Sequence, residues 1–272
     1  MIELLNIILF TGLILLGVGY FVKRNEGKIL NIAGYILFGV YWVFQVPYFL
    51  KIADSVNAVF CMLALPFFLY MAYHDFVSFK NNEDVGCLRF LAGWVFFAGF
   101  VYFLIEKTPA LEYGLRYEAA YETVLLLNLL GANATQEGIW IHWSDADAGI
   151  ILACTAIQSI MIFLGAFIAV KAELKRKIYA FLATCPVIWL LNLIRNASLM
   201  IIVGTTDIDM EFAHNYIGKT GSLIALIVLA FVVFRILPEL YDNIIGLTDL
   251  YKRKIGGEKM RIGDIKGLGG TL

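Results

Sequence analysis

Charge is scarce in this sequence, and neither sign is in excess. Only 16% of the 272 residues are charged and 61% are hydrophobic, whereas soluble domains average about 25% charged and about 45–50% apolar residues. This composition excludes an ordinary cytosolic globular protein. The 21 Lys and Arg residues are balanced by 22 Asp and Glu residues, so there is no positive excess to neutralise a phosphate backbone. We therefore expect no nucleic-acid partner.

Cysteine and the common catalytic motifs are also scarce. The four cysteines lie far apart without a CxxC pair, and three of them sit inside apolar runs, which argues against a disulfide framework and against a zinc site. The sequence has no Gly-rich phosphate loop, no HExxH and no GxSxG. We expect no cofactor and no metal, so any special cysteine has to act alone. The four cysteines are Cys61, Cys87, Cys154 and Cys185.

Long hydrophobic runs dominate what is present. A membrane span needs about 20 apolar residues to cross about 30 Å of hydrocarbon, and seven runs come close to that length. The sequence therefore predicts an all-α integral membrane protein with about seven transmembrane helices. The runs cover residues 2–22, 29–50, 55–74, 88–105, 149–170, 178–203 and 215–236.

Two segments between the fourth and fifth runs do not read as spans. Residues 109–131 start at a proline, end at a glycine and mix charges with leucines and tyrosines, which is typical of an interfacial amphipathic helix. Residues 132–148 alternate polar and apolar positions, which favours a short strand or hairpin. The expected regions are four N-terminal spans (1–108), the amphipathic helix and cap (109–148), a three-span core (149–239) and a mobile, Gly- and Lys-rich cytoplasmic tail (240–272).

The positive residues predict the orientation. Lys and Arg collect on the cytoplasmic side of a membrane protein, and an N-terminus placed outside puts most of the 21 basic residues inside. We therefore expect a multi-pass protein of the cytoplasmic membrane with its N-terminus out and its C-terminus in. The amphipathic helix and the hairpin then lie on the outer surface.

Three chemically capable side chains fall at similar depths in the last three runs. An ionisable group inside a span costs roughly 2.5–3.5 kcal/mol and is a functional candidate by default. At 1.5 Å per residue, Cys154 lies about 24 Å and Arg195 about 26 Å above the inner boundary. His214 precedes Arg235, an expected inner anchor, by about 31 Å. A thiol, a guanidinium and an imidazole therefore share one level near the outer surface.

These three groups together suit acyl transfer. A thiolate attacks a carbonyl, an imidazole moves the proton, and a fixed cation stabilises the thiolate or the oxyanion. Gln158, one helical turn after Cys154, and Asn192 and Asn196, which flank Arg195, would supply supporting hydrogen bonds. Taken singly, each of the three has a simpler interpretation: a cysteine as apolar filler, an arginine that snorkels to headgroups, and a histidine at an interface.

Three stretches carry a resemblance to a known family. The segment ACTAIQSI around Cys154, NLIRNASLMIIVG around Arg195 and AHNYIGKTGSL around His214 resemble the exosortases and archaeosortases, which are multi-span membrane cysteine transpeptidases. The resemblance covers roughly residues 110–236 and is strongest to the archaeosortase A group. It implies Cys154 as nucleophile, Arg195 as oxyanion or thiolate stabiliser and His214 as general acid and base. Some family members carry arginine at the third position, so Arg235 stays an alternative that the depth arithmetic disfavours.

The resemblance also implies substrates and a location. Its partners would be secreted surface proteins with a C-terminal Pro-Gly-Phe signal, an apolar helix and a basic tail, together with a membrane lipid that accepts the cleaved protein. The reaction would take place on the outer face of an archaeal cytoplasmic membrane. Two alternatives stay open: an intramembrane cysteine protease without transfer, and a transporter in which Arg195 binds an anion.

Overall fold

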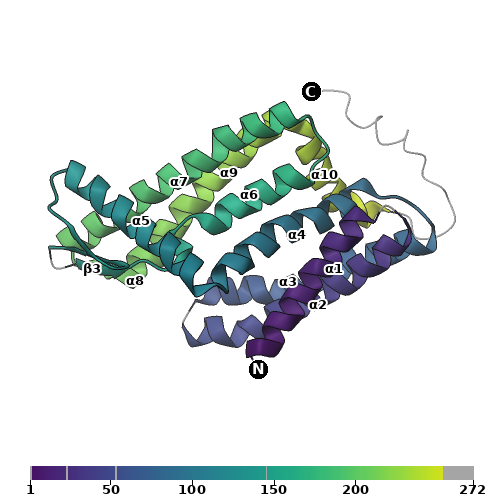
Figure 1. Cartoon of the computed structure of the whole chain (residues 1–272), viewed down its shortest axis with the longest axis horizontal. Coiled ribbons are helices and arrows are strands. Elements are labelled where there is room, and N and C mark those ends of the chain that lie inside the picture. The colour runs from purple at the N-terminus through teal and green to yellow at the C-terminus, as the bar shows by residue number, and fades with distance from the viewer. Residues whose placement is uncertain (1, 23, 53, 145, 254–272) are drawn as a thin grey trace.

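The computed structural model of the chain describes residues 2–22, 24–52, 54–144 and 146–253, and it shows a bundle of long helices with a small sheet at one end (Figure 1). Within these residues, six helices are long and apolar enough to cross a membrane. The prediction of an all-α membrane protein is confirmed. The six are α1 (Ile2–Phe21), α2 (Glu26–Lys51), α3 (Ser55–Lys80), α4 (Gly86–Glu106), α7 (Leu174–Thr205) and α9 (Lys219–Ile236).

The fifth predicted span, residues 149–170, differs from its expected form. Only α6 (Ile157–Ala169) is helical there, and its 13 residues are fewer than the roughly 20 that a membrane crossing needs. The preceding stretch forms the short 3₁₀ turn η1 (Leu152–Cys154). Hydropathy reports how apolar a stretch is and not how its backbone turns, so the sequence pattern merged a turn and a helix into one span.

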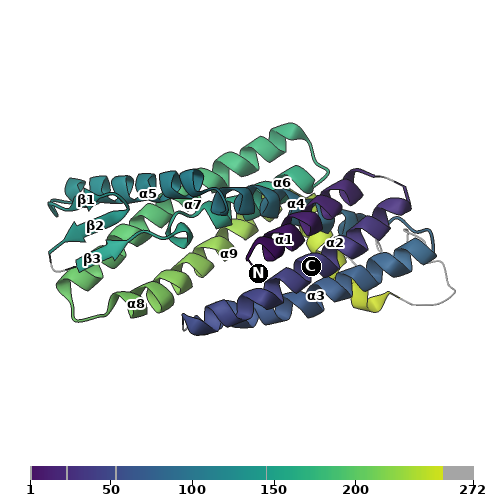
Figure 2. The same cartoon turned by 60° about the horizontal axis from the view of Figure 1, so that its bottom comes forward.

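The amphipathic helix and the cap lie where the sequence predicts them. Helix α5 (Pro109–Leu129) starts at its proline, which is favoured in the first helical turn. An antiparallel sheet follows in the order β1-β2-β3, and in Figure 2 its strand β3 faces the segment α8. We call this the sheet end of the bundle. The strands are β1 (Thr135–Glu137), β2 (Trp140–Trp143) and β3 (Ala146–Gly149), and α8 covers Met210–Phe212.

A shared apolar core holds the sheet against two helices. Ala120 and Leu127 of α5, Ile141 of β2 and Met200 of α7 are all buried in one cluster. Burial of apolar area of this kind contributes roughly 25 cal/mol per Å². Cys154 belongs to the same cluster, so the packing that fixes the sheet also fixes the backbone around this cysteine.

Close backbone contact positions α6 against α4. A Cβ atom added to Gly165 would lie 2.6 Å from the backbone nitrogen of Ala98, so only glycine allows this approach. The indole nitrogen of Trp94 donates a hydrogen bond to the carbonyl of Ile162 at 2.7 Å. The N-terminal helices thereby support the helix that follows Cys154.

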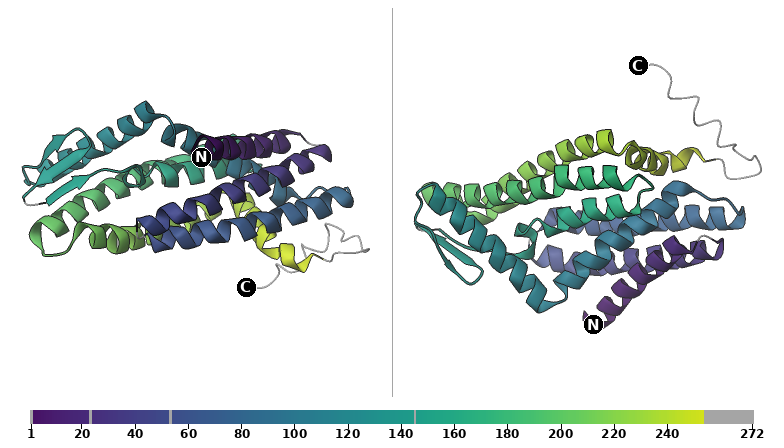
Figure 3. Two further views of the ribbon diagram at one scale, coloured as in Figure 1. Left: turned by 90° about the horizontal axis from the view of Figure 1, so that it is seen from below. Right: turned by 45° about the horizontal axis from the view of Figure 1, so that its top comes forward.

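The end of the bundle opposite the sheet holds the last described elements, α10 (Pro238–Thr248) and η3 (Asp249–Lys252) (Figure 3). Leu240 and Leu250 are buried. The prediction of a mobile tail from residue 240 is therefore wrong for residues 240–252, because these two leucines pack on the bundle. The rest of that predicted tail, residues 254–272, lies outside the described residues.

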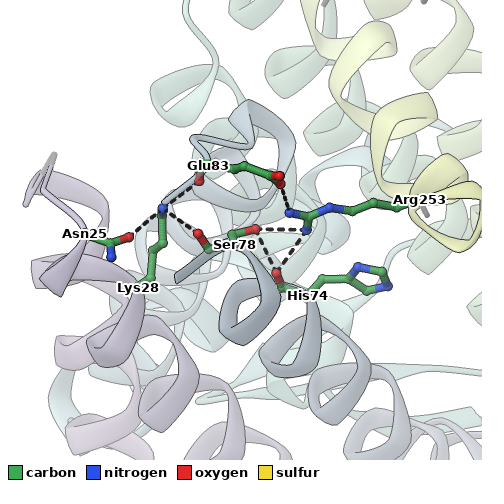
Figure 4. Close-up of polar contacts among 6 residues, drawn as sticks. All are labelled: Asn25, Lys28, His74, Ser78, Glu83 and Arg253. Atoms are coloured by element: carbon green, nitrogen blue, oxygen red, sulfur yellow. Dashed lines mark hydrogen bonds and ion pairs between the residues drawn. The ribbon is translucent and has the colours of Figure 1, made fainter. Parts of the chain in front are cut away.

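A polar cluster fastens the chain at this far end (Figure 4). The Arg253 guanidinium donates to the Ser78 hydroxyl at 2.9 Å and pairs with the Glu83 carboxylate. The Lys28 ammonium donates to the carbonyls of Ser78 and Glu83. The first turn of α2, the connection after α3 and the residue that follows η3 are thus tied together, and the site described below lies at the other end of the molecule.

Candidate active site

Cys154 stands on a tight turn. Its amide donates to the carbonyl of Ile151 at 2.8 Å, and the Thr155 hydroxyl donates to the carbonyl of Leu152 at 2.7 Å. Ala156 then adopts a left-handed conformation with φ of 61° before α6 begins. Such a conformation is costly for a residue with a Cβ atom, and residues of this kind concentrate at functional sites. The turn presents the cysteine at the start of α6 rather than inside a helix.

Two asparagines of α7 hold this turn from the other side. The amide nitrogens of Asn192 and Asn196 both donate to the Cys154 carbonyl, at 2.7 and 3.0 Å. Both side chains are buried, where an unmatched amide would be costly. The structure therefore brings both predicted supporting asparagines to Cys154, where they bind its backbone.

Arg116 of α5 also fixes the segment that leads to Cys154. Its Nε donates to the Ile150 carbonyl at 2.7 Å, and its Nη1 lies 3.2 Å from the Glu112 carboxylate. In the sequence, Arg116 is one of several charges on an amphipathic helix. It is the single basic residue of α5, and this is the signal that could have singled it out.

Arg195 and His214 complete the cluster around the thiol. The Nη1 of Arg195 donates to the Asn192 side-chain oxygen at 3.2 Å, and its Nη2 donates to Nδ1 of His214 at 3.3 Å. The Cys154 Sγ lies 3.8 Å from the same Nδ1. The three residues that the sequence placed at one depth are therefore in contact.

His214 sits on an unusual piece of helix. Residues Ala213–Gly218 form the π-helical segment η2, which continues directly into α9. Isolated π-helical turns are frequent at functional sites. Because arginine has only donors, Nδ1 of His214 must be the acceptor, which leaves the ring proton on Nε2 when the imidazole is neutral.

A cavity of about 450 Å³ opens onto this cluster. Cys154 and His214 line it, together with residues of β3 on one side and Met210 of α8 on another. Pockets that bind small ligands typically measure about 300–1,000 Å³. The cavity is therefore large enough for a substrate segment to reach the thiol.

Burial favours neutral resting groups in this cluster. Burial raises the pKa of the Cys154 thiol, and the Arg195 guanidinium opposes this shift without cancelling it. Burial, followed by the positive charges of Arg195 and Lys219, lowers the pKa of His214 to about 4. At neutral pH the resting site therefore holds a thiol beside an uncharged imidazole, and proton transfer accompanies the attack.

This electrostatic state predicts a specific pH dependence. Alkylation of Cys154 by iodoacetamide requires the thiolate, so we expect a slow rate at neutral pH that rises only above the ordinary pKa of a thiol. The imidazole loses its capacity to accept a proton as the pH falls through about 4, so kcat/KM should stay level at neutral pH and fall only in that acidic range. Fast alkylation of Cys154 at neutral pH would instead indicate a preformed thiolate–imidazolium pair.

Gly218 is a site residue that the sequence analysis missed. A Cβ atom placed there would lie 2.9 Å from Nε of Arg195 and 3.4 Å from Nη2 of the same residue. The Arg195 Nε is buried and has no hydrogen-bond partner among the described residues. The absence of a side chain at Gly218 thus leaves room for the guanidinium, and only the tertiary contact reveals it.

Replacing Gly218 with alanine should therefore affect activity more than stability. The new methyl group meets the end of a flexible side chain, so Arg195 swings away at little cost to folding, and we expect kcat/KM to fall about 10-fold or more because oxyanion contacts contribute strongly to rate. Gly221→Ala is the matched control, since a Cβ there meets nothing within 4 Å. Activity assays with thermal unfolding of both variants test this, and equal activity of the two would contradict it.

The other predicted site residues lie elsewhere. Gln158 is exposed on α6 and does not line the cavity that Cys154 lines. The helix begins only at Ile157, so the expected one-turn spacing between residues 154 and 158 does not apply. Arg235 is exposed at the last turn of α9, far from the thiol. Among the described residues, no three His, Cys, Asp or Glu side chains gather as a metal site would require.

Fold and site define a multi-pass membrane protein in which a thiol and an imidazole line one cavity and a guanidinium contacts that imidazole. The chain belongs to the transmembrane exosortase family, whose model matches residues 6–233. This confirms the resemblance drawn from the three stretches around Cys154, Arg195 and His214.

Two relatives carry a more specific name. Archaeosortase A of Haloferax volcanii is 27% identical over 255 residues, with 85% of this chain and 82% of the relative covered. Archaeosortase A of Natronomonas pharaonis is 25% identical over 249 residues, with 78% and 77% covered. No solved structure matches the chain significantly.

Proposed function

We propose that this protein is a membrane cysteine transpeptidase that cleaves secreted surface proteins at a C-terminal Pro-Gly-Phe signal and transfers them to a lipid anchor. The observation that supports this proposal most is the Cys154 thiol 3.8 Å from His214 Nδ1, with Arg195 on the same nitrogen. Membership of the exosortase family and the two archaeosortase A relatives support the same reaction class.

The first half of the reaction forms a thioester. The Cys154 sulfur bonds to the carbonyl carbon of the scissile peptide while its proton passes to Nδ1 of His214, and the Arg195 N–H that occupied this nitrogen turns to the carbonyl oxygen. Arg195 stabilises the negative charge that develops on the carbonyl oxygen. The carbon–nitrogen bond then breaks, and the departing amine takes the proton from His214. The C-terminal piece leaves, and the rest of the substrate stays bound to sulfur.

The second half releases the product. A hydroxyl or amino group of the acceptor lipid attacks the thioester carbon while its proton passes to His214. The carbon–sulfur bond breaks, and the Cys154 sulfur recovers its proton from the imidazole. Water in place of the lipid would give hydrolysis without transfer, so the acceptor decides between a transpeptidase and a protease.

The position of the site suits a substrate that arrives along the membrane. Cys154 and His214 line a cavity together with residues of β3, and β3 lies at the end of the bundle opposite α10 (Figure 1). In the proposed orientation, with the N-terminus out and the C-terminus in, the sheet end faces the outside of an archaeal cytoplasmic membrane. A substrate held by its own apolar helix would present its signal at that level, which raises the effective concentration of the scissile bond.

Intact-mass spectrometry tests the proposal directly. Purified protein in nanodiscs is incubated with a model substrate that ends in Pro-Gly-Phe, an apolar helix and basic residues. We expect release of the C-terminal piece and an adduct on Cys154 with the mass of the remaining substrate. Archaeal lipids added to the nanodiscs should discharge this adduct onto lipid, whereas discharge onto water alone would indicate a protease. The absence of both cleavage and adduct with reduced Cys154 would contradict the proposal.

A further inference from the structure

One edge of the sheet faces the cavity, and no described strand pairs with it. In the order β1-β2-β3, strand β3 pairs with β2 and with no other strand of the described residues. Its residues Asp147, Ala148 and Gly149 line the cavity that also contains Cys154 and His214. Figure 2 shows β3 as the strand of the sheet that lies toward α8, and Met210 of α8 lines the same cavity.

The register shows which backbone groups point into the cavity. The amide of Ile150 donates to the carbonyl of Ile139, and hydrogen-bonded and non-hydrogen-bonded pairs alternate along antiparallel strands. Gly149 opposite Trp140 and Asp147 opposite His142 are therefore non-hydrogen-bonded pairs. The N–H and C=O groups of Gly149 and Asp147 consequently point away from β2, and no described residue forms a hydrogen bond with them.

An unpaired strand edge is a ready template for another extended chain. Here the edge lines the cavity, and its chain continues through Ile150, held by Arg116, to the turn that carries Cys154. A peptide laid along β3 therefore runs toward the thiol. The ligand that matches two N–H and two C=O groups in a row is an extended peptide backbone.

We propose that the substrate segment next to the scissile bond binds as a fourth strand on the free edge of β3, through the backbone of Asp147 and Gly149. This inference rests on the proposed function, because it assigns the binding mode of that substrate. Backbone pairing holds the peptide whatever its side chains are, so proteins of different sequence can present one signal to the same thiol.

The proline of the signal sets the expected register. Proline has no N–H and is tolerated only where that position faces away from the neighbouring strand. The residue directly before the proline therefore points its N–H and C=O toward β3, the second residue before it points away, and the third points toward β3 again.

N-methylation of the substrate backbone tests this pattern without altering the protein. A set of model substrates carries a single N-methyl group at each of the four residues before the proline, and kcat/KM is measured for each. We expect a loss of about 10-fold or more at the first and third residues, since a hydrogen bond is lost and the methyl group blocks strand approach. Losses at the second and fourth should stay within about 3-fold.

The results distinguish a failure of the proposed binding mode from a failure of the proposed reaction. If the unmodified substrate is not cleaved, the proposed function fails. If it is cleaved and the four methylated substrates show equal losses or none, the pairing with β3 is overturned while the transpeptidase stands. Alternation with a period of two supports the pairing.

A pair of variants tests the protein side of the same contact. Asp147→Pro removes an N–H that β2 does not use, whereas Asp147→Ala removes the carboxylate that contacts His142 Nδ1 at 2.6 Å and keeps the N–H. We expect KM for Asp147→Pro to exceed that of Asp147→Ala about 5-fold or more, with both variants shown to be folded by thermal unfolding. Equal KM values in folded variants would overturn the assignment of the edge. Should Asp147→Pro not fold, the N-methyl series still decides.

Discussion

Replacing Cys154 with alanine is expected to lower substrate processing about 10³-fold or more, since removal of a nucleophile leaves only the contribution of binding and oxyanion contacts. The substitution removes the single sulfur that lies 3.8 Å from His214 Nδ1. It leaves the backbone contacts from Asn192 and Asn196 in place, because these reach the carbonyl of residue 154 and not its side chain. The fold should therefore survive while the reaction stops.

Two other cysteines provide the control. Cys61 and Cys185 are as buried as Cys154, with exposed fractions of 3%, 4% and 6%. Neither lines the cavity. Alanine at either position removes a similar buried volume, so any general effect of losing a buried sulfur appears in all three variants. Measuring product release and thermal unfolding for the three variants decides the matter, and substantial processing by Cys154→Ala would rule out the thioester route.

Replacing Arg195 is expected to have the second largest effect, about 10²–10³-fold in kcat/KM, which is typical for the loss of an oxyanion contact. Lysine should not restore the activity. One planar guanidinium reaches both the Asn192 oxygen and His214 Nδ1, and an ammonium group is a compact point charge that cannot reproduce that fork. Arg195→Lys and Arg195→Gln should therefore be similarly impaired.

The same substitution has an electrostatic readout that a purely structural role would not give. The Arg195 charge lowers the pKa of the Cys154 thiol and lowers the pKa of His214. Its removal in Arg195→Gln should raise both pKa values, so alkylation of Cys154 should require a higher pH than in the unaltered protein. Unchanged alkylation profiles together with full activity of Arg195→Lys would contradict the role assigned to the guanidinium.

An ion pair between the start of α9 and the start of α3 is a contact that no sequence pattern predicts. Lys219, directly after the segment that carries His214, pairs with Asp54 at the start of α3 at 2.8 Å. The two residues are 165 positions apart, and neither belongs to a recognisable motif. Their contact exists because α3 and α9 place these ends at the same level, and it holds the His214 segment against the N-terminal helices.

The sequence by itself determined the class of the molecule and the level of its site. Apolar runs of membrane length are unfavourable in contact with water, so they lie in a membrane. There they have to be helices, because a helix satisfies every backbone hydrogen-bonding group within itself. Because a helix rises by a fixed 1.5 Å per residue, counting residues predicts one depth for Cys154, Arg195 and His214. For Cys154 the count passes through residues before Ile157 that are not α-helical, so its position depends on the turn that precedes α6. The amphipathic helix and the hairpin followed from their own periodicities.

Only the tertiary structure decided what these residues contact. A common depth leaves each side chain free to point to any side of its helix, and rotation about the helix axis is set by packing against neighbours, such as the approach of Gly165 to Ala98. The left-handed turn at Ala156 moved Gln158 away from the thiol and the empty space at Gly218 admitted the guanidinium. Both features depend on chain segments that meet only after folding. Local sequence pattern and composition therefore could not predict them.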